Sequence, residues 1–368
     1  MQKLYIWEQS GWPYLTWDNK ELSPLLGEVR NKQGQLIGKI SLLDNDLKNK
    51  TIHGAVVSDI IESANIEGFA LDEEQVMITT GLYLSKKRFQ LSKTEDTSVG
   101  ASQIFIDALY NYKSPITEER IFNWKYALEG KTDYTPDSIG WQKKDMILNF
   151  YSSTLVERKM EYMKIPIPKD TEDEMNSFLT WVNTAHPTDP VIKAGVAYLR
   201  FLLIRPFDKN NGRIARNISN IFLSRADNSS ERIYSISAQI ERERQQYNEI
   251  ITRTQTGELD ITEWLRWFLY CLESALIIAE KALERVLNKS KFFDTFRLVS
   301  LNDRQLKMIN TLLDGGYDGN ISSSTWAFIN KCSSDTALRD IQYLVSKKML
   351  RKETAGGRST SYSINEEI

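Results

Sequence analysis

The chain has 368 residues, 41% of them hydrophobic, which is enough for two or three domains with real cores. Its net charge of −2 excludes nucleic-acid binding through an overall positive charge. No stretch is long and apolar enough to cross a membrane, and the N-terminus lacks the pattern of a signal peptide, so we expect a cytoplasmic protein. With two cysteines and two histidines, we expect no metal site.

Aromatic residues cluster at the start of the chain, and we predict that they dock onto the next part of the protein rather than form a ligand cage. They are Tyr5, Trp7, Trp12, Tyr14 and Trp17. Leucines at helical spacing over residues 20–43 predict two helices joined by a turn at Gly34. Apolar residues predict a further helix over residues 52–67, with Gly68 as its C-terminal cap.

The middle of the sequence combines helical patterns with one predicted hairpin. Residues 146–162 contain alternating and β-branched residues, which are typical of two antiparallel strands. Apolar residues at helical spacing predict helices over residues 172–182, 191–204, 238–251 and 261–287. The last of these either closes a helical bundle or pairs two subunits of a homodimer.

A polar turn at residues 205–212 separates the helix over 191–204 from another helical pattern. A helix N-terminus is an anion site, because its first N–H groups have no partner within the helix and the helix dipole adds positive potential. Arg213 and Arg216 lie three residues apart, so both side chains can point at a ligand held by the turn. An ordinary turn with surface arginines fits the same residues.

Residues 205–216, RPFDKNNGRIAR, resemble the signature loop of Fic-domain proteins, His-Pro-Phe-x-Asp/Glu-Gly-Asn-Gly-Arg-x-x-Arg. Most members of this family transfer AMP from ATP to a hydroxyl group of a target protein. Matches occur at Pro206, Phe207, Asn211, Gly212, Arg213 and Arg216. In three places the chain differs: Arg205 replaces the catalytic histidine, Lys209 the acidic residue that holds the divalent metal, and Asn210 a glycine.

The replacements at Arg205 and Lys209 remove the groups that the family's reaction needs. Neutral imidazole can take a proton from the attacking hydroxyl, whereas arginine, with a pKa above about 12, stays protonated. Losing a general base typically costs on the order of 10²–10⁴-fold in rate. Lys209 cannot bind Mg²⁺, although it can pair with a phosphate, and Asp208 could supply a carboxylate only in a shifted register. We therefore expect a loop that binds ATP or another anion. Without the acidic ligand we expect no effective Mg²⁺ site, and without the base we expect impaired AMP transfer.

The resemblance also implies roles for residues beyond the turn. The nucleotide-binding residues that it implies are Lys209, Asn210, Asn211, Gly212, Arg213, Arg216, Tyr247 and Asn248. Tyr247 fits a core position equally well. Ser63, Glu67 and Gly68 resemble the inhibitory motif of the family. In that motif the glutamate pairs with the second arginine of the signature, here Arg216, and blocks the productive pose of ATP; an ordinary glutamate at a helix end is the alternative.

The predicted hairpin corresponds to an element that the family uses for binding its targets. There the hairpin, called the flap, aligns an extended segment of the target protein by strand addition. The resemblance therefore implies that residues 146–162 contact a target protein or an active paralogue of this chain.

The last part of the sequence predicts a separate winged-helix domain after a charged connector at residues 289–298. Three helices and two strands are expected, over residues 303–313, 324–331, 334–347, 349–353 and 360–364. The third helix would enter a DNA groove, with Arg358 on the wing. Its predicted DNA contacts are Ser334, Thr336 and Arg339. Residues 301–364 are only mildly basic, so protein contacts are nearly as well supported as DNA contacts.

Together these patterns predict a mainly α protein in three parts. They are an N-terminal helical region with the aromatic cluster and the inhibitory helix (1–90), a Fic-type helical bundle with a β-hairpin flap (91–288), and a winged-helix domain (289–368). The predicted function is that of an adenylyltransferase-like pseudoenzyme that binds a nucleotide or another anion and acts as a regulator. Two alternatives stay open: a DNA-binding transcriptional regulator with a sensory Fic core, and an active transferase with altered chemistry.

Overall fold

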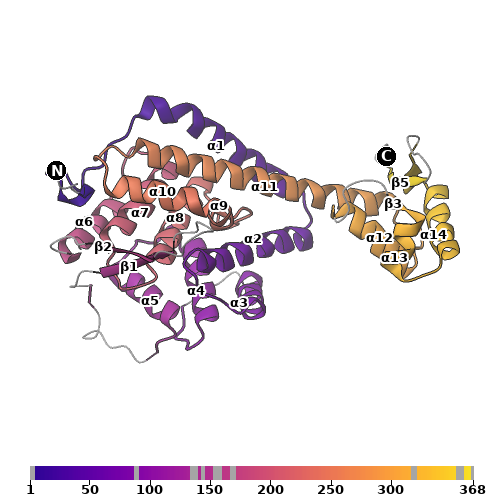
Figure 1. The fold of residues 1–368 in the computed structure, drawn as a ribbon, viewed down its shortest axis with the longest axis horizontal. Coiled ribbons are helices and arrows are strands. Elements are labelled where there is room, and N and C mark those ends of the chain that lie inside the picture. The colour runs from indigo at the N-terminus through magenta and orange to yellow at the C-terminus, as the bar shows by residue number, and fades with distance from the viewer. Residues whose placement is uncertain are drawn as a thin grey trace. The chain divides into compact units, whose positions relative to one another are not determined.

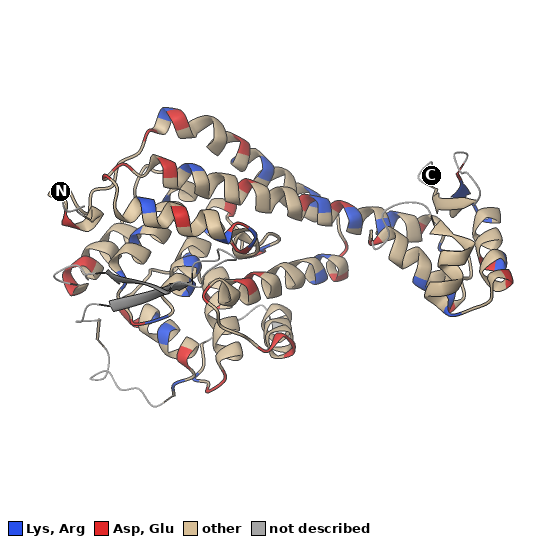
Figure 2. Cartoon of the chain, in the orientation of Figure 1, with Lys and Arg blue, Asp and Glu red and all other residues tan. Residues whose placement is uncertain are grey.

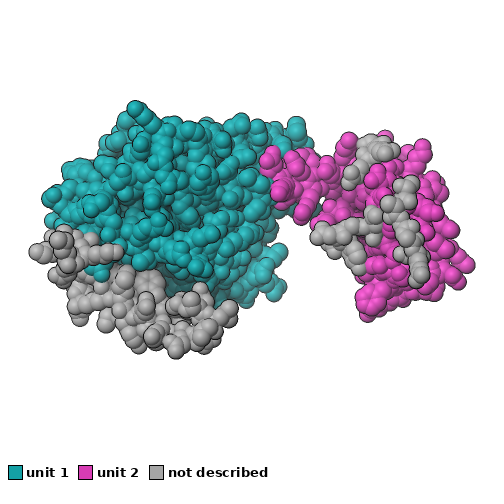
Figure 3. Space-filling model, turned by 45° about the horizontal axis from the view of Figure 1, so that its top comes forward, with its two compact units in different colours: residues 1–279 teal, residues 280–368 magenta. Residues whose placement is uncertain are grey.

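The computed structural model describes residues 5–86, 91–132, 140–141, 146–151, 160–165, 171–315, 321–353 and 360–365. These residues form a mainly α-helical protein, as predicted (Figure 1). The chain divides into two compact units, residues 1–279 and 280–368, which are coloured separately in Figure 3. The boundary falls within the long helix α11 (Thr262–Thr295), so the N-terminal helices and the predicted helical bundle share the first unit.

Unit 1 is a bundle of helices with one two-stranded hairpin among its described residues. In chain order its elements are η1 (Ile6–Glu8), α1 (Asn19–Ile40), α2 (Asn45–Asn65), α3 (Glu73–Lys86), α4 (Thr97–Tyr110), α5 (Glu118–Glu129), β1 (Met146–Tyr151), β2 (Met160–Ile165), α6 (Thr171–Asn183), α7 (Pro190–Ile204), α8 (Asn211–Asp227), α9 (Ile236–Arg242), α10 (Arg244–Gln255) and most of α11. Several of these helices begin where a side chain accepts a hydrogen bond from a free N–H group, as Asp44 does for α2 and Thr117 does for α5.

Helix α1 corrects one prediction, because it runs without interruption through Gly34. A glycine inside a helix costs only about 1 kcal/mol relative to alanine. Asp18 caps the start of α1 by accepting from the N–H groups of Lys20 and Glu21, and one face of the helix is buried along its length. The cap and the buried face therefore stabilise α1 enough to tolerate this glycine, which faces open space.

Helices α7 and α8 form the centre of unit 1, where they pack against each other (Figure 1). Pro190 is the first residue of α7, and Asp189 caps this helix by accepting from the N–H group of Val191 at 2.7 Å. Residues 191–204 of α7 and residues 211–224 of α8 are all buried. The loop that joins these two helices is therefore held from both sides by the interior of unit 1.

The predicted hairpin is present as the antiparallel pair of strands β1 and β2. Its register pairs Met146 with Ile165 and Tyr151 with Met160, so the second strand extends three residues beyond its predicted end. The residues 152–159 that connect the two strands lie outside the described residues.

Unit 2 combines three short helices with a three-stranded sheet in its described part. After the end of α11, its elements are α12 (Asp303–Leu313), β3 (Ile321–Ser322), α13 (Ser323–Asn330), α14 (Ser334–Ser346), β4 (Leu350–Lys352) and β5 (Ser361–Ile364). The sheet has the order β3–β5–β4, and both pairs are antiparallel. Its core includes Met308, Trp326, Ile341, Leu344 and Tyr362. Strand β3 was not predicted, because two residues are too few to show an alternating pattern.

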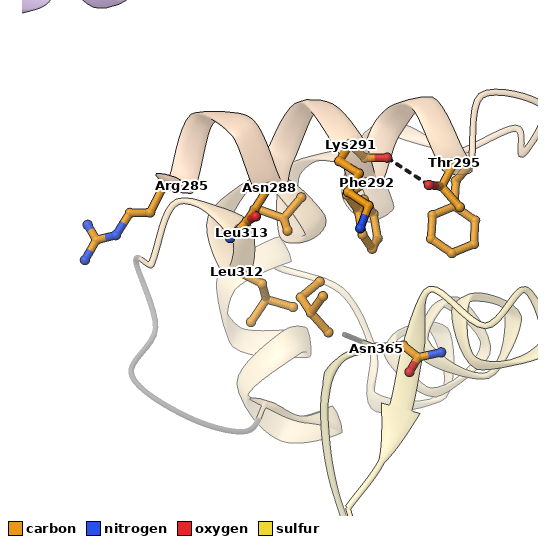
Figure 4. Close-up of a pocket in the computed structure, with 10 residues that line it drawn as sticks. Arg285, Asn288, Lys291, Phe292, Thr295, Leu312, Leu313 and Asn365 are labelled. Carbon is orange, nitrogen blue, oxygen red and sulfur yellow. Dashed lines mark hydrogen bonds between the residues drawn. The ribbon is translucent and has the colours of Figure 1, made fainter. Parts of the chain in front are cut away.

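The prediction of a charged connector at residues 289–298 is wrong for most of that segment. Helix α11 continues through it to Thr295. Phe292 is buried and belongs to the core of unit 2, and Lys289 forms an ion pair with Asp314 at 2.7 Å. Phe292 also lines a cavity of about 410 Å³ within this unit. Figure 4 shows Phe292 among the lining residues. The packing of an aromatic side chain thus keeps this segment helical, which the charge pattern does not reveal.

Charged side chains of both signs are interspersed over the helices, in keeping with the small net charge (Figure 2). No helix in the described parts of the chain combines the length and the apolar character that a membrane span requires. Over the same residues, no group of three or more His, Cys, Asp or Glu side chains is arranged to hold a metal ion.

Candidate functional site

The loop between α7 and α8 begins and ends with a residue in the left-handed region of backbone conformation. Arg205, which ends α7, has a φ of 52°, and Asn210, which precedes α8, has a φ of 65°. Asparagine enters this region more readily than most other residues with a side chain. Asn210 can therefore occupy a place where the family pattern has glycine.

Asn211 closes the loop with its own side chain. Its Oδ1 accepts from the N–H group of Phe207 at 3.1 Å, and its Nδ2 donates to the carbonyl oxygen of Phe207 at 2.7 Å. The ring of Phe207 packs against the rings of Phe122 and Trp141, which anchors the loop in the interior. The amide of Asn211 thus shapes the loop, whereas the sequence had placed it among the nucleotide-binding groups.

Arg216 is the most completely bonded side chain of the site. It is 1% exposed, and its Nε donates to Ser63 Oγ at 2.8 Å. Its Nη2 donates to the carbonyl oxygen of Ser63 at 2.6 Å and to Glu67 Oε1 at 2.8 Å. The predicted ion pair between Glu67 and Arg216 is therefore present, and it joins the C-terminal end of α2 to α8.

The carboxylate of Glu67 lies directly against the first turn of α8. A Cβ atom added to Gly212, the second residue of α8, would come within 2.1 Å of Glu67 Oε1. Only a glycine leaves room for this approach, because it has no side chain. Glu67 thus places a negative charge where the N-terminus of a helix favours one.

Two further arginines face the same region with unused hydrogen-bond donors. Arg205 Nη1 and Arg213 Nη2 are buried and have no hydrogen-bond partner among the described residues. Burial lowers the pKa of Arg205 and of Arg213 to about 10 in each case, which leaves both guanidinium groups charged at neutral pH. A buried charged donor without a partner is costly, so the site favours binding of an anion.

The remaining contacts of Arg213 fix its orientation. Its Nη1 donates to Asn210 Oδ1 at 3.3 Å, and its guanidinium group lies over the ring of Phe69 at 5.4 Å from the ring centre. Phe69 was not among the predicted site residues. Its position directly after Gly68, at the end of the predicted inhibitory motif, is the only signal for it in the sequence.

Lys209 and Asp208 are both exposed, unlike the rest of the loop. Lys209 therefore lies at the rim of the site and not in its buried part. The shifted register that would turn Asp208 inward is not seen. Arg213 and Arg216, which are buried, and Arg205, which is partly buried, supply the positive charge within the site instead of Lys209.

Tyr247 and Asn248, two of the predicted nucleotide-binding residues, lie in different environments. Residues 238–251 form parts of two helices, α9 and α10, because the chain bends at Glu243. Tyr247 is buried and accepts a hydrogen bond from the hydroxyl of Tyr198 at 2.8 Å. Asn248 is exposed, so the structure does not bring it into the buried part of the site.

Tyr198 is a site residue that the sequence did not identify. It lies on α7, and its hydroxyl accepts from Arg216 Nη1 at 3.4 Å while donating to Tyr247. Burial raises the pKa of Tyr198, so its hydroxyl stays neutral at physiological pH. The signal that could have found it is a single hydroxyl-bearing side chain within the apolar run of α7.

The predicted DNA contacts lie in unit 2, on the first two turns of α14. Ser334 and Arg339 are exposed, and Thr336 is half-buried. The hydroxyl groups of Thr336 and Ser333 lie 2.9 Å apart, so Thr336 takes part in the cap of this helix. Arg358, the fourth predicted contact, lies outside the described residues.

Comparison with known families places two matches on unit 1. Residues 115–223 match the Fic/DOC family, and residues 5–80 match a domain of unknown function (DUF4172). The first match covers the helices α5 to α8 almost completely, including the loop with Arg205. The second covers the N-terminal aromatic segment and the helices α1 and α2 with part of α3.

A curated relative of the same family is similar to part of the chain. A protein adenylyltransferase Fic of Nematostella vectensis is 29% identical over 113 residues, which cover 30% of this chain and 25% of that protein. The chain therefore spans about a quarter of the length of this curated relative. The identity is too local to transfer the activity of the whole relative.

Solved structures resemble this chain over a larger extent. A Fic family protein from Desulfovibrio desulfuricans G20 has a TM-score of 0.52 and 16% sequence identity, and the match covers 96% of this chain and 98% of that chain. A Fic domain containing signaling protein from Bacteroides thetaiotaomicron VPI-5482 has a TM-score of 0.48 and 20% identity, covering 69% of this chain and 98% of that chain. At these identities the first match supports a common fold.

Proposed function

Because residues 115–223 make this chain a Fic domain protein, we propose that the α7–α8 loop binds the phosphates of a nucleotide such as ATP and that Glu67 keeps this site closed. The observation that carries the proposal is the position of the Glu67 carboxylate. It lies against Gly212 at the start of α8 and pairs with Arg216, which is where a phosphate would find a helix N-terminus and a buried arginine. The unused donors of Arg205 and Arg213 could form further hydrogen bonds to an anion with several oxygen atoms.

The chemistry of this family is AMP transfer, and we propose that this chain performs it slowly at most. In that reaction a hydroxyl oxygen bonds to the α-phosphorus, the bond to the β-phosphate oxygen breaks, pyrophosphate leaves, and the hydroxyl proton passes to a base. Arg205 stands at the position of that base. Its pKa of about 10 keeps it protonated at neutral pH, so it cannot accept the proton.

The divalent metal of the family does not fit the residues present here. Lys209 replaces the acidic ligand, and the neighbouring Asp208 is exposed. Glu67 is already paired with Arg216. Arg205, Arg213 and Arg216 can neutralise phosphate charge without a metal ion. We therefore propose a regulator that holds a nucleotide without rapid turnover, in which the flap strands β1 and β2 contact a target protein or an active paralogue.

Replacing Glu67 by glycine tests the proposal, because it removes the competing carboxylate. We expect the dissociation constant for ATP, measured by isothermal titration calorimetry, to fall by about 10- to 100-fold, since hydrogen bonds to charged groups of this kind contribute about 1.5–3 kcal/mol. Glu62→Gly is the matched control, because Glu62 lies on α2 five residues before Glu67 and its carboxylate accepts a hydrogen bond from the side chain of Asn65, outside the loop. Equal and negligible ATP binding by Glu67→Gly and by the wild type, both folded, would refute the proposal.

A second function is favoured by the architecture of unit 2. Three helices combined with a sheet of order β3–β5–β4, in which β3 lies between α12 and α13 in the chain, fit a winged-helix domain. Helix α14, with Arg339 exposed, would be its DNA-reading helix. We propose that the full chain binds double-stranded DNA through this unit. A gel shift should show DNA binding at about 50 mM salt, and this binding should weaken steeply as the salt concentration is raised. At the same salt concentration, Arg339→Gln should bind DNA more weakly than the wild type. Arg253→Gln in unit 1 is the control; absence of any shift at low salt would exclude this function.

A further inference from the structure

A second cavity lies in unit 1, apart from the loop of the proposed nucleotide site. Its volume is about 590 Å³, which is within the range of about 300–1,000 Å³ that small-molecule sites occupy. The described residues that line it include Tyr14, Trp17, Ser177, Trp181, His186 and Arg200. They come from the N-terminal aromatic segment, from α6 and the turn that follows it, and from α7.

The N-terminal segment forms one wall of this cavity because it docks onto the helices of unit 1. The N–H group of Thr16 donates to the carbonyl oxygen of Leu259 at 2.9 Å, and Trp12 Nε1 donates to Glu174 Oε1 at 2.6 Å. These contacts hold residues 13–17 in place without filling the space beside them. Tyr14 remains 80% exposed, although it lines the cavity. The segment thus docks, as predicted, and also offers a flat aromatic surface.

Arg200 provides the charge of this cavity. It is 4% exposed, and its Nη2 donates to Ser177 Oγ at 2.9 Å. Its Nε is buried without a hydrogen-bond partner among the described residues. Burial lowers the pKa of Arg200 to about 10, so the guanidinium group stays charged at neutral pH. A buried guanidinium group with a free donor at a cavity wall favours an anionic ligand group.

Neighbouring groups among the described residues leave Arg200 Nε without a hydrogen-bond partner and its charge without an ion pair. Its guanidinium group lies 5.8 Å from the ring centre of Phe178 and 5.9 Å from that of Trp181. The charge of Glu174 is close enough to raise the pKa of Arg200, but the two side chains form no ion pair within the described structure. Glu174 Oε2 is buried without a hydrogen-bond partner among the described residues. Burial raises the pKa of Glu174, which weakens its role as a counter-ion.

We propose that this cavity binds a small organic carboxylate with a flat body, with the carboxylate on Arg200 and the body against Tyr14, Trp17 and Trp181. A planar guanidinium group matches the two oxygens of a carboxylate. A phosphate would draw on several donors, whereas Arg200 is the only Lys, Arg, Asp or Glu among the described lining residues. None of these residues belongs to the first turn of α6 or α7, so no helix N-terminus assists a second negative charge.

Calorimetric titration of the full chain with indole-3-acetate, benzoate and 4-hydroxyphenylacetate tests this inference, with indole-3-acetamide as the neutral counterpart. At least one carboxylate should bind with a dissociation constant of about 1 mM or lower, given the binding energy per atom of small ligands. The amide should bind about 10- to 100-fold more weakly than indole-3-acetate, because it lacks the charge. Failure of all three carboxylates to bind the folded protein, or equal affinity for acid and amide, overturns the proposal.

Variants separate a ligand site from a structural role of Arg200. Arg200→Gln should abolish carboxylate binding, and Arg253→Gln, an exposed arginine of α10 outside the cavity, should leave it unchanged. Tyr14→Ala covers the case in which Arg200→Gln does not fold, because Tyr14 is 80% exposed and can be removed without loss of core packing. It should weaken binding several-fold, as expected for the loss of one aromatic wall. Unchanged carboxylate affinity in Tyr14→Ala overturns the proposal, even if Arg200→Gln proves insoluble.

Discussion

The double replacement Arg205→His and Lys209→Asp, made together with Glu67→Gly, is expected to raise the rate of AMP transfer by about 10²–10⁴-fold over Glu67→Gly alone. It returns to the loop the imidazole and the carboxylate that the family pattern contains. Histidine is among the residues that enter the left-handed backbone region most readily, so it should tolerate the φ of 52° at position 205. The part of the loop that we propose to face the phosphates, with Gly212 and Arg216, is left intact.

Self-labelling with ATP that carries its label on the α-phosphate, in the presence of Mg²⁺ or Mn²⁺, measures this rate. The matched control is Arg205→Gln with Lys209→Gln in the same background, because it removes both cations without supplying a base or a metal ligand. A restored variant that binds ATP but labels no faster than this control would contradict the interpretation. The slow turnover that we propose would then have to come from the loop geometry and not from the two replaced groups.

Arg216→Met is expected to lower the free energy of unfolding of unit 1 by about 3–5 kcal/mol, the usual cost of removing one partner of a buried ion pair. Arg216 is 1% exposed and bonds to Ser63, Glu67 and Tyr198, which lie on or next to α2 and α7. Methionine keeps much of the volume but leaves the carbonyl oxygen of Ser63 without its donor and Glu67 without its counter-ion.

Urea denaturation followed by circular dichroism measures this loss. Because the chain forms two compact units, the transition of unit 2 should keep its midpoint and so serve as an internal reference. Arg253→Met is the matched control: Arg253 forms an exposed ion pair with Glu263 at 3.0 Å, and such pairs contribute at most about 1 kcal/mol. If both arginine variants shift the unfolding midpoint equally, Arg216 is not the link between the helices that its contacts indicate.

Local patterns in the sequence identify most of the helices and the position of the loop. Asp189 followed by Pro190, an apolar run and a polar turn define α7 and the start of α8, because capping and periodicity act over a few residues. The ion pair of Glu67 with Arg216 was also foreseeable, through the resemblance of two short motifs that lie about 150 residues apart. The errors at Gly34 and at residues 289–298 arose where packing outweighed a local signal.

The state of the functional groups depends on contacts that no local pattern contains. Folding turns the hydroxyl of Tyr198 toward Arg216 and that of Tyr247 toward Tyr198. It also buries one nitrogen atom each of Arg205 and Arg213 without a hydrogen-bond partner among the described residues. It likewise sets Arg200 beside an aromatic segment that lies almost two hundred residues earlier in the chain. The loop RPFDKNNGRIAR alone specifies which chemical groups are available. The burial of these groups, their charge and their unused hydrogen-bond donors follow from the packing of helices that are distant in sequence. The reason is that desolvation and hydrogen bonding depend on every neighbour in space.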